Sequence, residues 1–292
     1  MQLQIADCLL RIEGGNEILD YLPHLLPFAL PEAADSSCLC KIHLGCTLSP
    51  CSGTPDMVAM PDGRQIRIWF TRESCQLALE LPGCKHTYLL TTDRHWRQVW
   101  TNLCPSTSID YMALNDLLML SFIYSAAFAQ VVLIHASCIA IGEDGVAFLG
   151  PSGIGKSTHS RLWLAHIPHT RLLNDDQPAL RLLPEGDVLL YGTPWSGKTP
   201  CYRNEKVHLR AIFQMKQARE NEAVRLTGIQ AFRMLLGASS LMGRDGVSFA
   251  AISKTLSQIA GHIPAFVLRN RPEEAAARLS HELFLQSVST QI

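Results

Sequence analysis

The sequence is short of net charge and of long uninterrupted apolar runs. Its 25 Lys and Arg residues nearly balance 26 Asp and Glu, a formal net charge of -1 over 292 residues. A near-neutral chain lacks the broad basic field that attracts nucleic acid or an anionic membrane, so we expect neither as a partner. The most apolar segment, residues 117–134, contains Ser121, Tyr124, Ser125 and Gln130. It predicts a buried helix running into a strand, and no membrane span.

Targeting and repeat signals are also missing. Residues 1–7 show no basic region followed by an apolar stretch, so no signal peptide is predicted and the expected location is the cytoplasm. The chain has no internal repeat and no low-complexity tract. Its length predicts one large or two small domains, and an apolar content of 47% is ample for a packed core.

Cysteine is abundant for a cytoplasmic protein, with ten residues in the chain. The densest cluster is Cys38, Cys40, Cys46 and Cys51, which are separated by one, five and four residues. Structural zinc sites usually use C-x-x-C pairs, so this spacing favours free, reduced thiols. A metal site at this cluster is the alternative.

The most informative motif is a glycine-rich run in the middle of the chain. It matches the phosphate-loop pattern G-x-x-x-x-G-K-[ST]. A strand is predicted over residues 146–149 and a helix over residues 157–165, which is the context that the motif requires. Lys156 is expected to reach the β- and γ-phosphates, and the Ser157 hydroxyl to bind Mg²⁺. The predicted nucleotide-binding residues are Gly150, Pro151, Ser152, Gly153, Ile154, Gly155, Lys156, Ser157 and Thr158.

Hydrophobic patterning divides the chain into two predicted domains. Residues 1–110 are expected to form a small β-rich domain, because short alternating runs are separated by Pro and Gly. Residues 111–292 predict an α/β domain around the phosphate loop, with a helix at 115–130 and helices dominating after 228. Strands are predicted at residues 40–44, 65–70, 76–81, 131–135, 139–141, 146–148, 171–174, 178–183, 188–191, 211–215 and 265–268.

A pair of carboxylates follows the predicted strand at 171–174. Asp175 and Asp176 are adjacent, so on a strand they would point to opposite faces and need not share a role. One would address a metal and the other a nucleophile; a pair of turn-forming aspartates is the alternative. His135 ends the strand at 131–135, and by itself it would more often be a core histidine than a catalytic group.

A loop over residues 192–204 is rich in Gly and Pro and carries two cations. Lys198 and Arg203 are candidates to pair with a transferred phosphate, because phosphoryl transfer places negative charge on the equatorial oxygens. Trp195 is a candidate to cover the site and exclude water. A surface loop with solvated cations is the alternative.

Together these residues resemble the catalytic domain of HPr kinase/phosphorylase, which has the phosphate-loop fold of ATP-dependent phosphoenolpyruvate carboxykinase. The matching features are His135, the hairpin before the phosphate loop, the loop, and the Asp pair. The resemblance implies that Asp176 is the acid/base for a substrate hydroxyl and that His135 supports it. It further implies that Lys156 and Ser157 hold the phosphates and Mg²⁺. Asp175, the other member of the Asp pair, is then the candidate for a second metal ligand.

The resemblance is to a divergent member of that family. Thr158 stands where the family carries Glu, and residues 1–110 do not resemble the family's N-terminal domain. The chain looks closer to the HPr-kinase-like proteins that are encoded with peptide-modification systems, some of which phosphorylate a Ser on a small precursor peptide. The resemblance therefore implies an ATP- and Mg²⁺-dependent kinase acting on a Ser or Thr hydroxyl of a peptide or small protein. A small-molecule kinase and a non-catalytic nucleotide-dependent binding module are the alternatives, and a homo-oligomer is left open.

Overall fold

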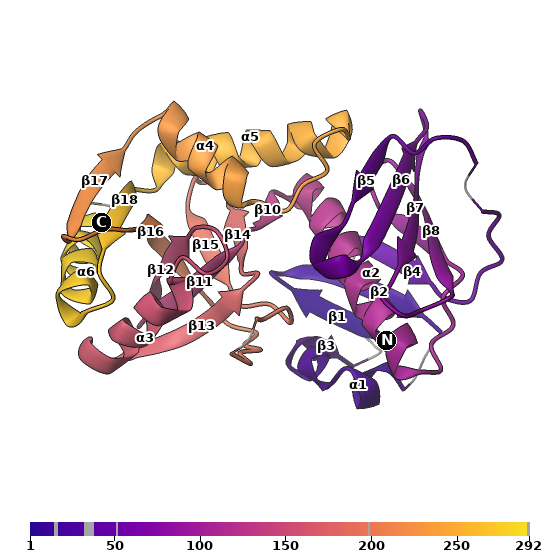
Figure 1. Ribbon diagram of the computed structural model, residues 1–292, viewed down its shortest axis with the longest axis horizontal. Helices are drawn as coiled ribbons and strands as arrows, with labels where there is room; N and C mark the ends of the chain where they lie inside the picture. Colours follow the sequence, from indigo (N-terminus) through magenta and orange to yellow (C-terminus); the bar gives the residue numbers. More distant parts are fainter. Residues whose placement is uncertain (15–16, 32–37, 51, 198, 291–292) are drawn as a thin grey trace. The chain divides into compact units, whose positions relative to one another are not determined.

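The fold is known from a computed structural model, which describes residues 1–14, 17–31, 38–50, 52–197 and 199–290 (Figure 1). The chain is a mixed α/β protein with two mixed sheets, and this agrees with the predicted α/β class. It divides into two compact units. One contains Met1–Ala129 and Leu241–Ala251, and the other contains Gln130–Ser240 and Ile252–Ile292.

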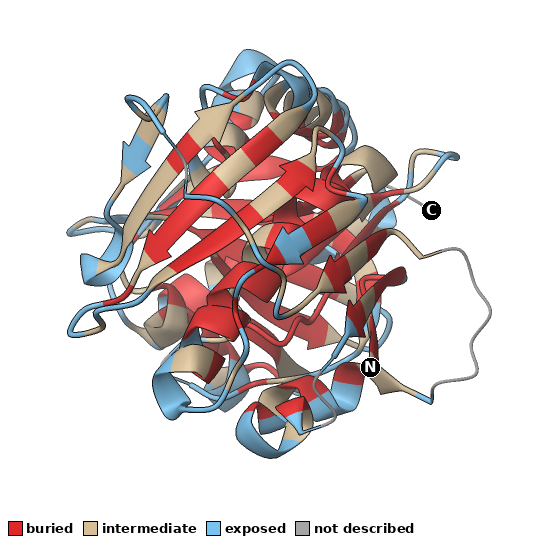
Figure 2. Ribbon diagram, turned by 90° about the vertical axis from the view of Figure 1, so that its right-hand side faces the viewer, coloured by how far each residue is buried: buried red, intermediate tan, exposed pale blue. Residues whose placement is uncertain are grey.

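The first unit is built around a sheet in the order β3-β1-β2-β4-β9-β8-β7-β6-β5. Buried residues gather along its central strands (Figure 2). The strands expected at 40–44, 65–70 and 76–81 are present as β4, β6 and β7. The elements of this unit before its long helix are β1 (Gln2–Ile5), β2 (Cys8–Glu13), α1 (Ile18–Tyr21), η1 (Pro23–Phe28), β3 (Ala29–Leu30), β4 (Cys40–His43), β5 (Met57–Ala59), η2 (Pro61–Gly63), β6 (Gln65–Phe70), β7 (Ser74–Glu80), β8 (Thr87–Asp93) and β9 (Gln98–Thr101).

The long helix α2 (Ser108–Ala126), followed by η3 (Ala127–Ala129), belongs to this first unit. Its Asp116 pairs with Arg64 at 2.5 Å, and its Tyr124 ring lies 5.0 Å from that of Trp96. The predicted boundary near residue 110 therefore differs from the boundary after Ala129 in the structure. The helix starts earlier than predicted because Thr107 and Asp110 form a capping box, in which each side chain binds the other's backbone N–H.

The same helix is the one described segment that is long and apolar enough to cross a membrane by length and composition, over Ser108–Ala129. This differs from the expectation that no segment reaches that length. Within the structure 67% of its most apolar window is buried. Burial of this kind is usual for the core helix of a folded domain.

The second unit has a sheet in the order β10-β14-β15-β16-β12-β11-β13, extended by β18 beside β16 and by β17 beside β18. Its predicted strands are present, and β17 is an additional antiparallel edge strand with an irregular exposure pattern. The elements are β10 (Val131–Leu133), β11 (Ala136–Ile141), β12 (Asp144–Leu149), α3 (Lys156–His166), β13 (Thr170–Asp176), β14 (Ala179–Leu182), β15 (Val188–Tyr191), β16 (Lys206–Gln217), β17 (Glu222–Leu226), α4 (Ile229–Ala238), α5 (Gly246–His262), β18 (Ala265–Asn270) and α6 (Glu274–Ser289). Of these, α5 begins in residues assigned to the first unit.

An aromatic core anchors the sheet of the second unit to α3 and α6. Phe148, Phe213 and Phe266 are aligned in register across β12, β16 and β18, with ring centroids 5.9 and 5.2 Å apart. Trp163 of α3 and Phe284 of α6 pack edge-on, 5.8 Å apart. All five rings are buried. Burial of large aromatic rings stabilises this layer and holds α3 in place at the end of β12.

Candidate functional site

The pairing of three strands brings the predicted site residues to one end of the second sheet. β11 runs antiparallel to both β12 and β13, and its first residue Ala136 is opposite Leu149 on one side and Asp176 on the other. His135 immediately precedes Ala136, and Gly150 immediately follows Leu149. Residues spread over more than forty positions of sequence therefore meet at one sheet edge.

The Gly150–Ser157 segment forms a tight loop between β12 and α3. Gly150, Gly153 and Gly155 have φ angles of 151°, 80° and 112°, which side chains other than glycine rarely adopt. Helix α3 starts at Lys156 with Gly155 at its N-cap. Because Gly155 has no side chain to act as a cap, the first N–H groups of the helix remain available for an anion.

Lys156 folds back over this loop. Its Nζ donates to Gly150 O at 2.8 Å and to Pro151 O at 3.3 Å, and it lies 2.9 Å from His135 Nε2. The residue is only 8% exposed. Burial lowers the pKa of Lys156 below its ordinary value, while the carboxylates of Asp176 and Asp175 act in the opposite direction. An ammonium group in this position is ready to bind an incoming phosphate.

His135 links the lysine to one of the two aspartates. Its Nδ1 lies 2.9 Å from Asp176 Oδ1, and its Nε2 faces the Lys156 ammonium. An ammonium can only donate, so Nε2 is the acceptor and the ring proton is on Nδ1, from which it is donated to the carboxylate. Lys156, His135 and Asp176 therefore form a continuous chain of hydrogen bonds. His135 is also partly exposed, so it is not a fully buried core histidine.

The two aspartates have different surroundings at the end of β13. Asp175 is buried, whereas the Asp176 side chain is 33% exposed. Asn174, which is fully buried, holds the turn that follows: its Oδ1 accepts from the N–H groups of Asp176 and Gln177, both at 3.0 Å. Sequence reasoning overlooked Asn174 as a functional residue. The available signal was a short amide side chain beside the Asp pair, which is suited to binding nearby backbone groups.

The loop after residue 192 is fastened to the Asp pair. Asn174 Nδ2 donates to Trp195 O at 3.2 Å, Gly197 N donates to Asp175 O at 3.2 Å, and Ser196 makes a single bridge with Asp176. Trp195 is buried, with 5% exposure. The ring is therefore packed in the interior, and its suggested role as a cover stays a prediction.

The two predicted loop cations can be only partly placed. Lys198 lies outside the described residues. Arg203 is exposed and pairs with Glu205 at 3.2 Å, and the same carboxylate accepts from Arg171 Nε at 3.0 Å. These two arginines hold the pKa of Glu205 below its ordinary value despite its partial burial. Arg203 and Arg171 therefore share the Glu205 carboxylate, and the three side chains together carry one net positive charge.

The donor atoms for Mg²⁺ are of the appropriate kind. Ser157 and Asp175 offer a hydroxyl and a carboxylate, and Mg²⁺ usually takes one or two such protein ligands together with substrate phosphates. The carboxylates of Asp176 and Asp175 both act electrostatically on Lys156. Within the part of the chain that the structure describes, no three His, Cys, Asp or Glu side chains gather as a metal site. The nine described cysteines are free thiols, and Cys51 lies outside the described residues.

Comparison with known proteins does not identify a family for this chain. No family model and no curated protein matches the chain. Among the solved structures that match is "Structure of the Hpr(Ser) kinase/phosphatase from Coxiella burnetii", which aligns with 55% of this chain and 95% of its own, with a TM-score of 0.30 and 13% identity. A likeness at this level carries no argument. We therefore infer function from the geometry of the site.

Proposed function

We propose that the protein is an ATP- and Mg²⁺-dependent kinase that transfers the γ-phosphate to a Ser or Thr hydroxyl of a peptide or small protein. The observation that supports this best is the hydrogen-bonded chain from Lys156 through His135 to Asp176. A module that only binds nucleotide needs the loop and its lysine. It has no need of a partly exposed carboxylate oriented by a histidine, which is the arrangement of a general base.

Each residue of the chain has a role in the proposed reaction. The acceptor hydroxyl attacks the γ-phosphorus, a new P–O bond forms to the acceptor, and the P–O bond to the leaving ADP breaks. The hydroxyl proton passes to Asp176, whose carboxylate is held in place by the Nδ1–H of His135. Lys156 and the first N–H groups of α3 bind the phosphate oxygens and offset the charge that develops on them.

Ser157 and Asp175 would hold the Mg²⁺, which when bound neutralises charge on the β- and γ-phosphates. The position of Asp175 at the buried side of the strand end separates it from the base. Arg203, through the residual charge of its cluster with Glu205 and Arg171, is the candidate to approach the transferred phosphate, and Lys198 shares that role in the proposal.

The acceptor is proposed to bind through the first unit, as an extended peptide. Its sheet ends at the short strand β5, which pairs with β6 on one side. Val58 on this strand and the adjoining Met60 are exposed, at 52% and 67%. An edge strand with free backbone groups and neighbouring apolar side chains can add a peptide strand. We propose a small precursor peptide as the acceptor and the cytoplasm, where ATP and Mg²⁺ are available, as the location.

The test is phosphate transfer by the purified full-length protein. We expect slow ATP hydrolysis without an acceptor and labelling of Ser or Thr in a peptide library when γ-labelled ATP and Mg²⁺ are supplied. Lys156→Ala should abolish both reactions, because it removes the point charge on the phosphates. Lys254→Ala, which removes an exposed lysine of α5, is the matched control and should retain full activity.

Two results would contradict the proposal. Activity of Lys156→Ala within tenfold of the wild type would exclude the loop as the phosphate site. Tight ATP binding without transfer to water, to peptides or to small-molecule hydroxyls would leave a nucleotide-dependent binding module as the function. Phosphate transfer to small molecules alone would support the kinase reaction but show that the acceptor is a small molecule and not a peptide.

A further inference from the structure

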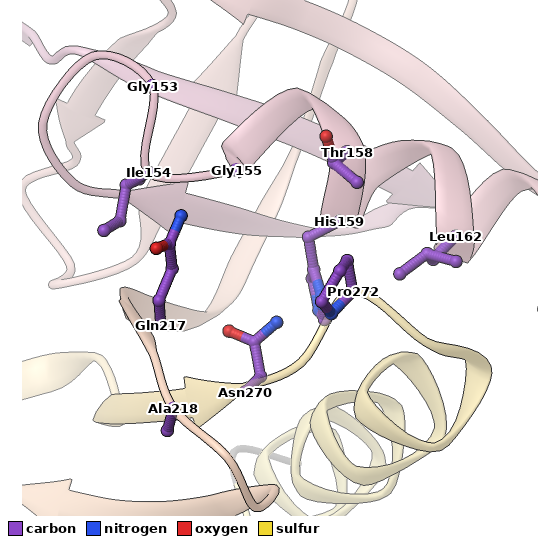
Figure 3. Close-up of a pocket in the computed structure, with 10 residues that line it drawn as sticks. All are labelled: Gly153, Ile154, Gly155, Thr158, His159, Leu162, Gln217, Ala218, Asn270 and Pro272. Atoms are coloured by element: carbon purple, nitrogen blue, oxygen red, sulfur yellow. The ribbon is translucent and has the colours of Figure 1, made fainter.

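A cavity of about 480 Å³ opens beside the glycine-rich loop, within the second unit. This volume lies in the range of ~300–1,000 Å³ that is usual for small-molecule sites. Figure 3 shows that its walls come from the loop, from the first turns of α3, and from the segments that follow β16 and β18. Apolar surface is supplied by Ile154, Leu162, Ala218 and Pro272.

The topology of the sheet explains why this cavity lies next to the phosphate loop. β12 is parallel to β16, and β16 is parallel to β18, so the carboxyl ends of all three strands lie at one edge. β12 leads into the loop, while β16 and β18 end at Gln217 and Asn270, which are register partners. Ligands of open α/β sheets bind at this edge. Gln217 thus lies on the strand next to the one that feeds the loop, and Asn270 lies on the strand beyond it.

The cavity is uncharged. Among the described residues that line it there is no Asp, Glu, Lys or Arg. Its one ionisable group is His159, which is buried and whose Nε2 lies 2.9 Å from Ser280 Oγ of α6. Such walls suit an uncharged aromatic ring better than a second phosphate group.

Two carboxamides, those of Gln217 and Asn270, are directed into the cavity (Figure 3). Asn270 is 9% exposed, and its Nδ2 donates to Arg271 O at 3.1 Å. That bond fixes the orientation of the amide and leaves Oδ1 as an acceptor toward the cavity. Gln217 is exposed and supplies both a donor and an acceptor.

We infer that this cavity is a purine subsite that selects adenine, with Gln217 and Asn270 as the residues that read the edge of the base. The inference rests on the proposed function, because it assigns the base of the same nucleotide whose phosphates bind at Lys156. Adenine presents an amino donor beside a ring-nitrogen acceptor, and a carboxamide matches that pair. Guanine presents two acceptors at the same edge, which would place its O6 against the acceptor Asn270 Oδ1, where a donor would be needed instead.

The test compares ATP, GTP and inorganic tripolyphosphate as ligands of the full-length protein in calorimetric titrations with Mg²⁺. We expect the wild type to bind ATP about tenfold or more tightly than GTP, the discrimination that one good amide–base pair provides. Gln217→Ala should weaken ATP binding about tenfold, bring the ATP and GTP affinities together, and leave tripolyphosphate binding unchanged. Gln258→Ala, an exposed glutamine of α5, is the matched control and should change none of the three.

Asn270→Ser is the second variant, with far-UV circular dichroism to verify its fold because Asn270 is buried. It should lower the preference for ATP in the same way, and Gln217→Ala alone decides the question if Asn270→Ser does not fold. Equal binding of ATP and GTP by the wild type, together with tight tripolyphosphate binding, overturns the adenine subsite and leaves the phosphate site standing. Failure of the wild type to bind any of the three ligands overturns the proposed function as well.

Discussion

Asp175 and Asp176 are neighbours in sequence but have opposite environments. Asp175 is buried, whereas the Asp176 side chain is 33% exposed and bound to His135. This contrast follows from their places on β13, because adjacent residues of a strand point to opposite faces. In the proposed reaction, the more exposed carboxylate serves the acceptor hydroxyl and the buried one serves the metal.

The first prediction separates these two roles. Asp176→Asn should lower the turnover number by about 10²–10⁴-fold, the usual contribution of a general base, and should leave ATP affinity nearly intact. Asp175→Asn should instead raise the Mg²⁺ concentration needed for half-maximal rate. Steady-state rates over a Mg²⁺ series measure both effects. Asp187→Asn, an exposed aspartate in the β14–β15 turn, is the control. If Mg²⁺ rescues Asp176→Asn and not Asp175→Asn, the two roles are reversed.

A second residue-scale feature is the close approach of Gly197 to the Asp pair. A Cβ at this position would lie 2.8 Å from Asp175 O and 3.4 Å from Asp176 Cβ. Contacts this short require the loop or the aspartates to move. The absence of a side chain at Gly197 therefore allows the loop to lie against the catalytic strand.

The second prediction is that Gly197→Ala impairs turnover without impairing phosphate binding. A displacement of about 1 Å at reacting groups can cost about 10²-fold in rate, so we expect a fall of that order in kcat. Tripolyphosphate affinity should stay at the wild-type level because the loop at Gly150–Ser157 is untouched. Gly237→Ala is the matched control, since a Cβ there meets nothing within 4 Å. Wild-type kcat in Gly197→Ala would show that the Asp pair does not depend on this contact.

At the scale of elements, α3 connects the phosphate loop to the core through a buried polar group on α6. Ser280 Oγ donates to a carbonyl of its own helix, at 3.1 Å, and accepts from Trp163 Nε1 at 2.9 Å. His159 Nε2 lies 2.9 Å from the same oxygen. Because that hydroxyl proton is committed, His159 must be the donor through Nε2. Burial lowers the pKa of His159 to about 4, so the ring is neutral at physiological pH. The anchoring of α3 therefore depends on an uncharged histidine.

The third prediction concerns the pH dependence of stability. The ordinary pKa of His159 is 6.5, and burial lowers it to about 4 in the folded protein. The unfolded chain takes up this proton as pH falls below 6.5, whereas the folded protein does so only near pH 4. The unfolded state then binds more protons than the folded state. The free energy of unfolding therefore decreases as the pH is lowered from 6.5 to 4, by at most about 3 kcal/mol.

Urea unfolding at a series of pH values between 6.5 and 4 measures this loss. His159→Gln retains a donor for Ser280 and removes the titrating group, so its midpoint should decline less steeply than that of the wild type. His86→Gln, an exposed histidine, should decline as the wild type does. Identical slopes for the wild type and His159→Gln would exclude His159 as the source of acid sensitivity.

At the scale of the whole molecule, the two units divide the proposed work. The loop, His135, the Asp pair and the core of α3 and α6 all belong to the second unit. The edge strand β5 that we propose for the acceptor belongs to the first. The apolar helix α2 also lies in the first unit, so a fragment that begins near residue 110 would carry this helix without the sheet on which it packs.

The fourth prediction uses a fragment that begins at Gln130. It should bind ATP within about tenfold of the full chain and hydrolyse it slowly, because it retains every residue that contacts the phosphates in the proposal. It should lose peptide phosphorylation. A folded far-UV spectrum is the required control, since residues 241–251 of this fragment belong to the first unit. Acceptor phosphorylation at the full rate by the folded fragment would place recognition in the second unit.

Local patterns in the sequence predicted the elements of the second unit well. The hairpin turning near Gly142 is present as β11 and β12, and the helix after the loop is present as α3. Such features depend on glycine conformations, turn residues and apolar periodicity within a short window. The capping box that starts α2 and the irregular edge strand β17 were missed. The capping box is signalled only by Thr107 and Asp110, a polar pair ahead of the apolar residues of the helix. Strand β17 shows no clear alternation of apolar and polar residues that would predict it.

The sequence by itself determined the loop, its glycine conformations and the presence of an Asp pair at a strand end, because each of these is a property of adjacent residues. Only the tertiary structure decided that His135 lies between Lys156 and Asp176. That arrangement depends on β11 pairing with β12 and β13 at once, in a register that places Ala136 opposite both Leu149 and Asp176. Register between distant strands depends on which surfaces pack together across the whole sheet, and no local pattern of residues encodes it.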